Sequence, residues 1–168
     1  VDAVNEQAEY LRTGLDFISL KKKSEEFLNK TLNTSITYIN TFNVMSMEGF
    51  TDYLKFILEM RSKFSSDKQG TKFIEIYDPY NEHPDYEVHA RQRIWFDVPL
   101  LRYPDWMSIN LLDDTWNYVF EEAIEFMEAN LLESDHDFVG FYDFEIDKVK
   151  RNLEWMNTEH NSMPEDKL

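Results

Sequence analysis

The sequence predicts an α/β fold with a largely parallel sheet. Strand-like segments, rich in β-branched and aromatic residues, alternate along the chain with segments that have the helical period. This alternation favours βα units, whose strands are parallel. Hydrophobic residues make up 42% of the 168 residues, which is enough for a core, and the 4 Gly and 5 Pro are few for a disordered chain. The length favours a single domain.

The first elements are a strand end and two helices. An extended segment stops at Asp2. Asn5 is then expected to cap a short helix over Glu6–Arg12, and Gly14 suits the end of that helix. A mostly polar helix is predicted over residues 20–33.

The clearest strand runs from about Ser35 to Phe42, because its residues are β-branched or aromatic and nearly alternate in polarity. Ser46 is expected to cap the helix that follows. The apolar residues of that helix recur at helical spacing. They are Phe50, Tyr53, Leu54, Ile57, Leu58 and Phe64.

Two further strands are predicted, over residues 71–78 and 91–101, with a polar segment between them. Pro99 in the second places an edge, a bulge or a loop there, since proline cannot donate to a ladder. Residues 108–112 are predicted to form a further short extended segment. Three βα units are few for a closed barrel.

Two helices complete the chain, one capped by Asp113 or Asp114 and one starting near Asp143. Their apolar residues recur at helical spacing. They are Trp116, Val119, Phe120, Ala123, Ile124, Met127 and Leu131 in the first, and Ile146, Val149, Leu153 and Met156 in the second. We therefore divide the chain into residues 1–112, with a polar insert at about 65–90, and an acidic helical region, 113–168.

Charge and composition exclude several classes of protein. The net charge is −16, and residues 113–168 hold 16 acids against 4 bases. Such a surface argues against binding nucleic acid or anionic membranes. The chain has no Cys, hence no disulfide or thiolate metal site, and no apolar run approaches a membrane span. We expect a cytoplasmic protein.

The carboxyl ends of parallel strands are where sites gather in βα folds. This rule selects Asp2, Thr41, Asn43 and the segment from Asp97 to Leu101. Asp2 and Asn43 also suit plain cap or turn roles. Arg12 is either a surface charge paired with a neighbour such as Glu9, or a guanidinium fork for a ligand carboxylate.

A weaker candidate is a metal site in "HPDYEVH". His83, Asp85, Glu87 and His89 alternate, so in a strand they would share one face and could bind a divalent ion. Pro84 disfavours regular strand pairing there. No glycine-rich phosphate loop or nucleophile elbow is present.

Four stretches in order resemble twitch-domain-containing radical SAM proteins of the phage and marine bacterial type. Asp2 followed by Glu9-Tyr10-Leu11-Arg12-Thr13-Gly14 resembles the segment after their fourth barrel strand. Residues 35–54 are similar to their fifth strand and its helix. Residues 95–112 resemble the sixth strand with its exit pattern, and residues 140–156 a late helix.

The resemblance implies the C-terminal half of a partial (β/α)6 TIM-like barrel, followed by C-terminal helices. The intact parent would bind a [4Fe-4S] cluster and S-adenosylmethionine, and cleave the latter to a 5′-deoxyadenosyl radical that abstracts hydrogen from an unknown substrate. Arg12 would clamp the methionyl carboxylate. The ribose or substrate would be lined by Asp2, Thr41 and Asn43. The adenine would lie near Val98, Pro99 and Leu100.

The family's C-x-x-x-C-x-x-C loop is not in these 168 residues. We therefore expect a C-terminal portion that is inactive alone and associates with itself through an exposed barrel edge. The alternative is a non-enzymatic acidic domain that binds a basic protein.

Overall fold

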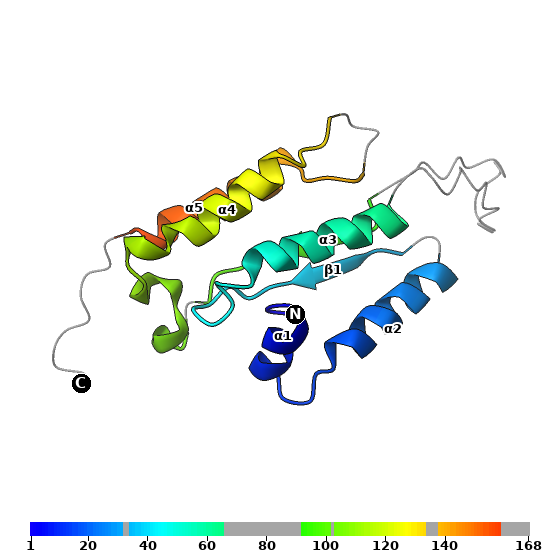
Figure 1. Cartoon of the computed structure of the whole chain (residues 1–168), viewed down its shortest axis with the longest axis horizontal. Helices are drawn as coiled ribbons and strands as arrows, with labels where there is room; N and C mark the ends of the chain where they lie inside the picture. The colour runs from blue at the N-terminus through cyan, green and yellow to red at the C-terminus, as the bar shows by residue number, and fades with distance from the viewer. Residues whose placement is uncertain (32–33, 66–91, 102, 134–137, 159–168) are drawn as a thin grey trace, which may run out of the picture.

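The protein is a mixed α/β structure with a small parallel sheet, seen in a computed structural model that describes residues 1–31, 34–65, 92–101, 103–133 and 138–158 (Figure 1). Its elements follow in chain order. They are α1 (Asn5–Leu11), α2 (Phe17–Lys30), β1 (Ile36–Ile39), α3 (Phe50–Phe64), β2 (Ile94–Asp97), three 3-10 turns (η2 Asp105–Met107, η3 Ile109–Leu111, η4 Asp114–Trp116), α4 (Asn117–Glu128) and α5 (Asp143–Met156).

The two strands are parallel, as predicted. Ile36 pairs with Ile94 and Ile39 with Asp97, and a further parallel bridge joins Phe42 to Leu100. The helix α3 lies between the strands in the sequence and packs against β2. The α/β class with parallel strands is thereby confirmed, whereas two strands do not define a barrel. The predicted strand over residues 71–78 and most of the polar insert lie outside the described residues.

Each outer edge of this strand pair has a different neighbour. Along β1, the amino group of Val1 donates to Ile39 O at 2.7 Å, so the opening residues run beside the end of the strand. Along β2, the side chains of Arg61 and Asn152 donate to Ile94 O and Val98 O, both at 3.0 Å. Side chains therefore occupy the β2 edge, where a further strand would otherwise pair.

One face of the sheet is buried under α3. Tyr38 and Phe96, which oppose each other across the strands, contact Phe56 and Tyr53 of the helix with ring centroids 5.0 and 6.2 Å apart. Alternation sends Thr37 and Ile39 to the other face, where both are exposed and Ile39 retains 49% of its surface. The core thus lies between the sheet and the helices.

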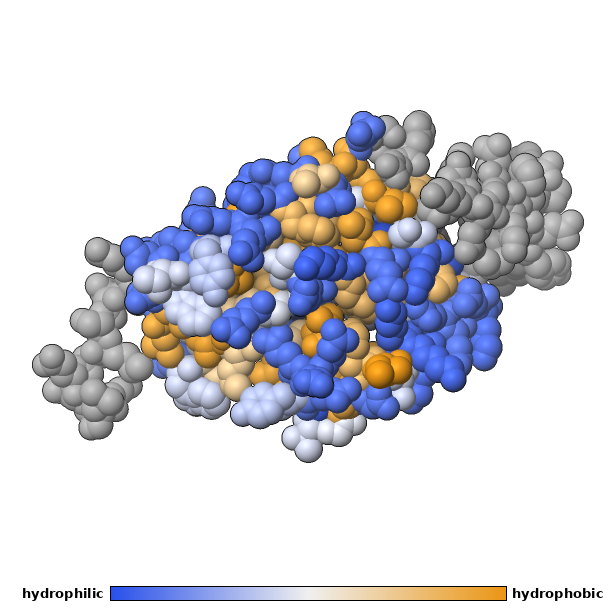
Figure 2. Space-filling view, viewed as in Figure 1, coloured by the Kyte–Doolittle hydropathy of each residue, from blue (hydrophilic) through white to orange (hydrophobic). Residues whose placement is uncertain are grey.

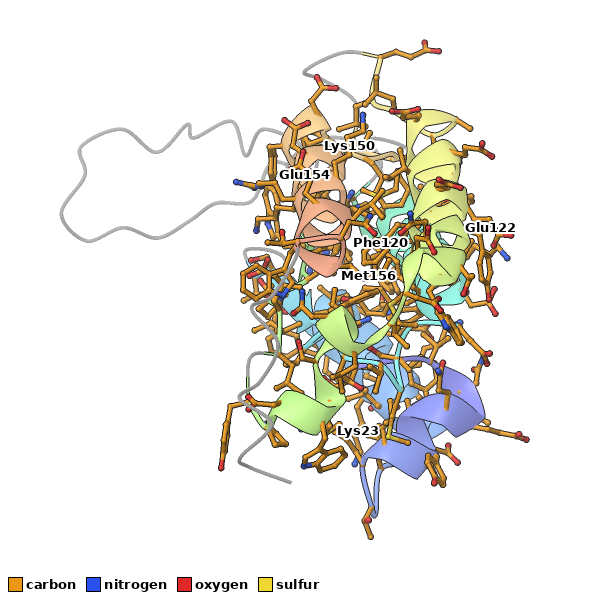
Figure 3. The ribbon with its side chains drawn as sticks, turned by 90° about the vertical axis from the view of Figure 1, so that its left-hand side faces the viewer. Lys23, Phe120, Glu122, Lys150, Glu154 and Met156 are labelled. Carbon is orange, nitrogen blue, oxygen red and sulfur yellow. The ribbon has the colours of Figure 1, made fainter. Side chains whose placement is uncertain are left out.

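The helices α4 and α5 lie side by side and extend this helical layer beyond α3 (Figures 1 and 3). In Figure 3, Phe120 and Met156 point into the interior and Glu122 points away from it. The structure confirms the predicted start of α5 at Asp143. Leu131 lies after the end of α4 and is 41% exposed, so its predicted place on the buried face was wrong.

Three local predictions are corrected. Asn5 does not cap α1: it is the first helical residue, with a positive φ of 52°, and Val4 precedes it. Ser46 does not cap α3, which begins after Gly49, because its hydroxyl is bound to the Asn43 backbone. The segment 108–112 is not extended throughout: Ile109–Leu111 form the turn η3, since the Ser108 side chain accepts from Asn110 N–H.

Polar side chains cover much of the face drawn in Figure 2, with apolar atoms between them. No helix in the described part of the chain combines the length and the apolar character that crossing a membrane requires. Asp113 caps η4 and thereby starts the turn that leads into α4, as its sequence position predicted.

Candidate functional site

The carboxyl end of β1 brings together three predicted site residues from distant parts of the sequence. Asp2 accepts from Arg12 through both carboxylate oxygens, at 2.6 Å from Nε and 3.2 Å from Nη2. The same carboxylate accepts the backbone N–H of Thr41 at 3.1 Å. Asp2 therefore joins the opening segment, the end of α1 and the end of β1.

The electrostatics of this cluster favour its charged state. Desolvation of the buried Asp2 carboxyl opposes its ionisation, but the hydrogen bonds from Arg12 and Thr41 and the Arg12 charge outweigh it, so the pKa of Asp2 lies below its ordinary value. The hydrogen bond to Asp2 and the charge of Asp2 raise the pKa of Arg12. The pair is ionised throughout the neutral range.

Arg12 combines features of both predicted readings. It forms an ion pair, but with Asp2 and not with Glu9, whose carboxylate accepts Phe17 N–H at 3.0 Å. Its side chain is still 57% exposed, and Nη1 donates to no described group. Asp2 thus fixes the guanidinium of this partly exposed side chain, and the terminal nitrogen that Asp2 does not bind can donate to an incoming carboxylate.

Asn43 serves the turn that follows β1. Its side-chain nitrogen donates to Thr41 O at 2.8 Å, and its side-chain oxygen accepts Met45 N–H at 3.0 Å. The residue is 4% exposed. The turn role left open by the sequence is therefore the one that the described contacts show.

The carboxyl end of β2 borders a hollow of about 430 Å³ between the strand and α5. Val98, Pro99 and Leu100 line it together with residues of α5. Phe42 N–H donates to Pro99 O at 2.8 Å, which ties this segment to the extension of β1. Of the seven predicted cofactor residues, five therefore follow the ends of the two neighbouring strands, and the other two, Asp2 and Arg12, reach the end of β1 through the bond from Thr41 N–H to Asp2.

The proposed metal ligands cannot be placed. His83, Asp85, Glu87 and His89 lie outside the described residues. Within the residues that the structure describes, no group of three or more His, Asp or Glu side chains could hold a metal ion.

Sequence reasoning missed a buried ion pair that ties the two predicted regions together. Arg61 of α3 donates to both oxygens of Glu145 in α5, at 2.9 and 2.7 Å, and the two side chains are 0% and 1% exposed. Arg61 follows Ile57 by four residues, which places it on the apolar side of α3. This position was the indication in the sequence that Arg61 is buried.

Sequence reasoning also missed the α5 wall of the hollow, which is formed by Lys148, Arg151 and Asn152. Lys148 pairs with Asp97 at 2.7 Å. These residues recur at spacings of three and four, which place them on one side of the helix.

Comparison with known proteins identifies no relative: no protein-family model, curated protein or solved structure matches the chain.

Proposed function

We propose that these residues are the carboxyl-terminal part of a radical SAM enzyme, with its cofactor face at the carboxyl ends of β1 and β2. The observation that carries the proposal is the cluster of Asp2, Arg12 and Thr41. Two segments resembling consecutive barrel strands pair in parallel and in the expected order, which supports it. Val1 lies beside Ile39, as the end of a preceding parallel strand would.

The residues fit one of the two implied groups and not the other. Arg12 offers a donor for a carboxylate, and Val98, Pro99 and Leu100 offer apolar surface for an adenine ring, so they suit S-adenosylmethionine. When bound, that cofactor supplies the radical that abstracts hydrogen from substrate. The chain has no Cys, so its residues do not fit a thiolate-bound iron–sulfur cluster.

In this proposal each residue has a limited task. Asp2 holds the Arg12 guanidinium in place through two hydrogen bonds, and Thr41 N–H holds Asp2. Arg12 then binds and orients a carboxylate at the strand end. Asp2 is a positioning residue, because it acts through Arg12.

The test uses the whole protein, with the residues that precede Val1 in its gene, after anaerobic reconstitution of iron and sulfide. Arg12→Ala is expected to weaken S-adenosylmethionine binding by about tenfold or more, since a hydrogen bond to a charged group contributes about 1.5–3 kcal/mol. Lys23→Ala is the matched control, because Lys23 lies exposed on α2. Unchanged affinity in Arg12→Ala, with the cluster intact, would refute the clamp.

A second candidate is a non-enzymatic acidic interaction domain. The outer side of α4 carries Glu121, Glu122, Glu125 and Glu128, all exposed. A basic protein partner would bind there with strong salt dependence. Binding that is equally strong at low and high salt would contradict this candidate. Charge reversal at Glu122 and Glu125 separates it from the enzyme proposal, because it should weaken binding of the basic partner and leave S-adenosylmethionine binding unchanged.

A further inference from the structure

The basic residues of the acidic C-terminal region are concentrated on α5. Of the 4 Lys and Arg residues after position 112, three are Lys148, Lys150 and Arg151. Lys150 pairs with Glu128 at 2.8 Å. Lys148 and Arg151 instead line the hollow of about 430 Å³ beside the end of β2. A chain of net charge −16 thus places two of its cations at one concave site.

Whereas Lys148 pairs with Asp97, Arg151 is the cation of this hollow that forms no ion pair with a described residue. Its Nε donates to Asp147 O at 3.3 Å. Among the described arginines, it alone uses neither terminal nitrogen on a described group, whereas Arg12, Arg61 and Arg93 each do. Its guanidinium fork is therefore available to a carboxylate or similar anion.

The strand end adds a backbone donor to the same hollow. Phe42 N–H donates to Pro99 O and Leu101 N–H donates to Phe42 O, so the Leu100 N–H between them points away from β1. That N–H donates to no other part of the described chain. On the same side, Val98 O is already bound by Asn152. An anion in the hollow can therefore accept from both Arg151 and Leu100.

The charges that line the hollow favour a monoanion. Asp97 and Lys148 neutralise each other at 2.7 Å, so Arg151 supplies the net positive charge of the lining. Asp147 and Glu154 border Arg151 in the neighbouring hollow. The volume exceeds what a bare carboxylate fills, and Val98, Pro99 and Leu100 supply an apolar wall. Both observations favour a carboxylate carried on an apolar body.

We propose that the hollow between β2 and α5 binds an organic monocarboxylate with an apolar body, which Arg151 holds by a bidentate contact and Leu100 N–H by a third. The site uses the α5 side of the segment from Val98 to Leu100. It requires only this chain, but it shares Val98, Pro99 and Leu100 with the proposed adenine surface, so the two ligands would compete for the hollow.

The test is an NMR titration of the ¹⁵N-labelled 168-residue chain with phenylacetate. We expect saturable shifts at the Leu100 amide and the Arg151 Nε–H. Phenylacetamide removes the charge, acetate removes the apolar body, and phenyl phosphate adds a second charge, so each is expected to bind more weakly than phenylacetate.

Matched variants then locate the site. Arg151→Gln is expected to weaken phenylacetate binding by at least about tenfold, because it removes a charge-assisted contact. Lys150→Gln removes a charge one residue away, outside the hollow, and is expected to change the affinity less than about twofold. Arg151→Lys keeps the charge without the fork and should be intermediate.

Three results would overturn the proposal. The first is equal affinity in Arg151→Gln and the unsubstituted chain. The second is binding of phenylacetamide as tight as that of phenylacetate, which would make the hollow an apolar site only. The third is tightest binding by phenyl phosphate, which contradicts the charge assignment.

Discussion

The buried pair of Arg61 and Glu145 should contribute more to stability than any exposed ion pair of the chain. Arg61→Met removes two bonds to Glu145 and the bonds to Ile94 O and Gly140 O. It leaves Glu145, which is 1% exposed, with Tyr142 N–H as its remaining described donor. Breaking a buried pair from one side costs about 3–5 kcal/mol, so we expect a loss of that size in the free energy of unfolding.

The stacking of Arg61 raises the expected loss toward the upper part of this range. Its guanidinium carbon lies 5.6, 5.5 and 5.8 Å from the ring centroids of Phe96, Phe141 and Tyr142. Contacts of this kind are stronger where water is excluded. A loss of about 4–5 kcal/mol lowers the folding equilibrium constant by about three powers of ten or more, since each power of ten corresponds to about 1.36 kcal/mol.

Urea unfolding followed by circular dichroism measures this loss. The matched control is Lys63→Met, also on α3, which removes pairs with Glu59 and Glu25 whose partners are 44% and 29% exposed. Such pairs contribute about 0–1 kcal/mol. A loss in Arg61→Met no larger than in Lys63→Met would refute the reasoning.

The double variant Arg61→Met, Glu145→Gln separates charge from packing. Glutamine keeps an oxygen to accept Tyr142 N–H and removes the unpaired buried charge. We expect it to restore much of the stability lost in the single variant, because a neutral replacement of a buried pair is often tolerated. If the double variant is no more stable than Arg61→Met, lost packing explains the loss.

Three further predictions follow from the sheet and its ends. The pKa of Asp2 is lowered in the folded protein, so its ionised form stabilises the fold at pH values above the ordinary aspartate pKa. This stabilisation is lost as the pH falls through the lowered pKa. In urea unfolding, Asp2→Asn should therefore remove this acid-side change in the free energy of unfolding. Asn152→Ala leaves Val98 O without its described side-chain donor and should cost about 1–3 kcal/mol in the same assay, and an unchanged midpoint would contradict it. The chain should self-associate in sedimentation velocity through the part of the outer edge of β1 that precedes Ile39, whose carbonyl is already bound by Val1, and a charge on the adjoining exposed face in Ile39→Lys should weaken that association; a monomer at all concentrations would contradict an open edge.

Local pattern was enough to predict the helices and the parallel pair of strands. The apolar stripe of α3 and the alternation in β1 each repeat over enough residues to define their type. The errors occurred at the ends of elements. Asn5 and Ser46 are ordinary capping residue types, but Ser46 is bound to Asn43 and α1 starts one residue earlier than the Asn5 cap required. For Ser46, a competing hydrogen bond to the backbone three residues earlier decided between two plausible local arrangements.

The candidate site was predictable to a smaller extent. The rule for strand ends selected Asp2 and Thr41, which meet, but it could not reveal that Asp2 is the partner of Arg12. That pairing depends on how α1 folds back toward β1. The wall formed by Arg151 could not be predicted for the same reason, since the other side of the hollow is formed by Asp97, Val98, Pro99 and Leu100, which lie 51 to 54 positions earlier in the chain.

The most direct test of the proposed function is formation of 5′-deoxyadenosine by the whole protein under anaerobic reducing conditions, with S-adenosylmethionine added and the cluster verified by its absorbance. The account predicts that the product forms in the unsubstituted protein, forms equally in Lys23→Ala, and is strongly reduced in Arg12→Ala at the same cluster content. No 5′-deoxyadenosine from a protein with a full cluster, or an upstream sequence that encodes no C-x-x-x-C-x-x-C, would contradict it.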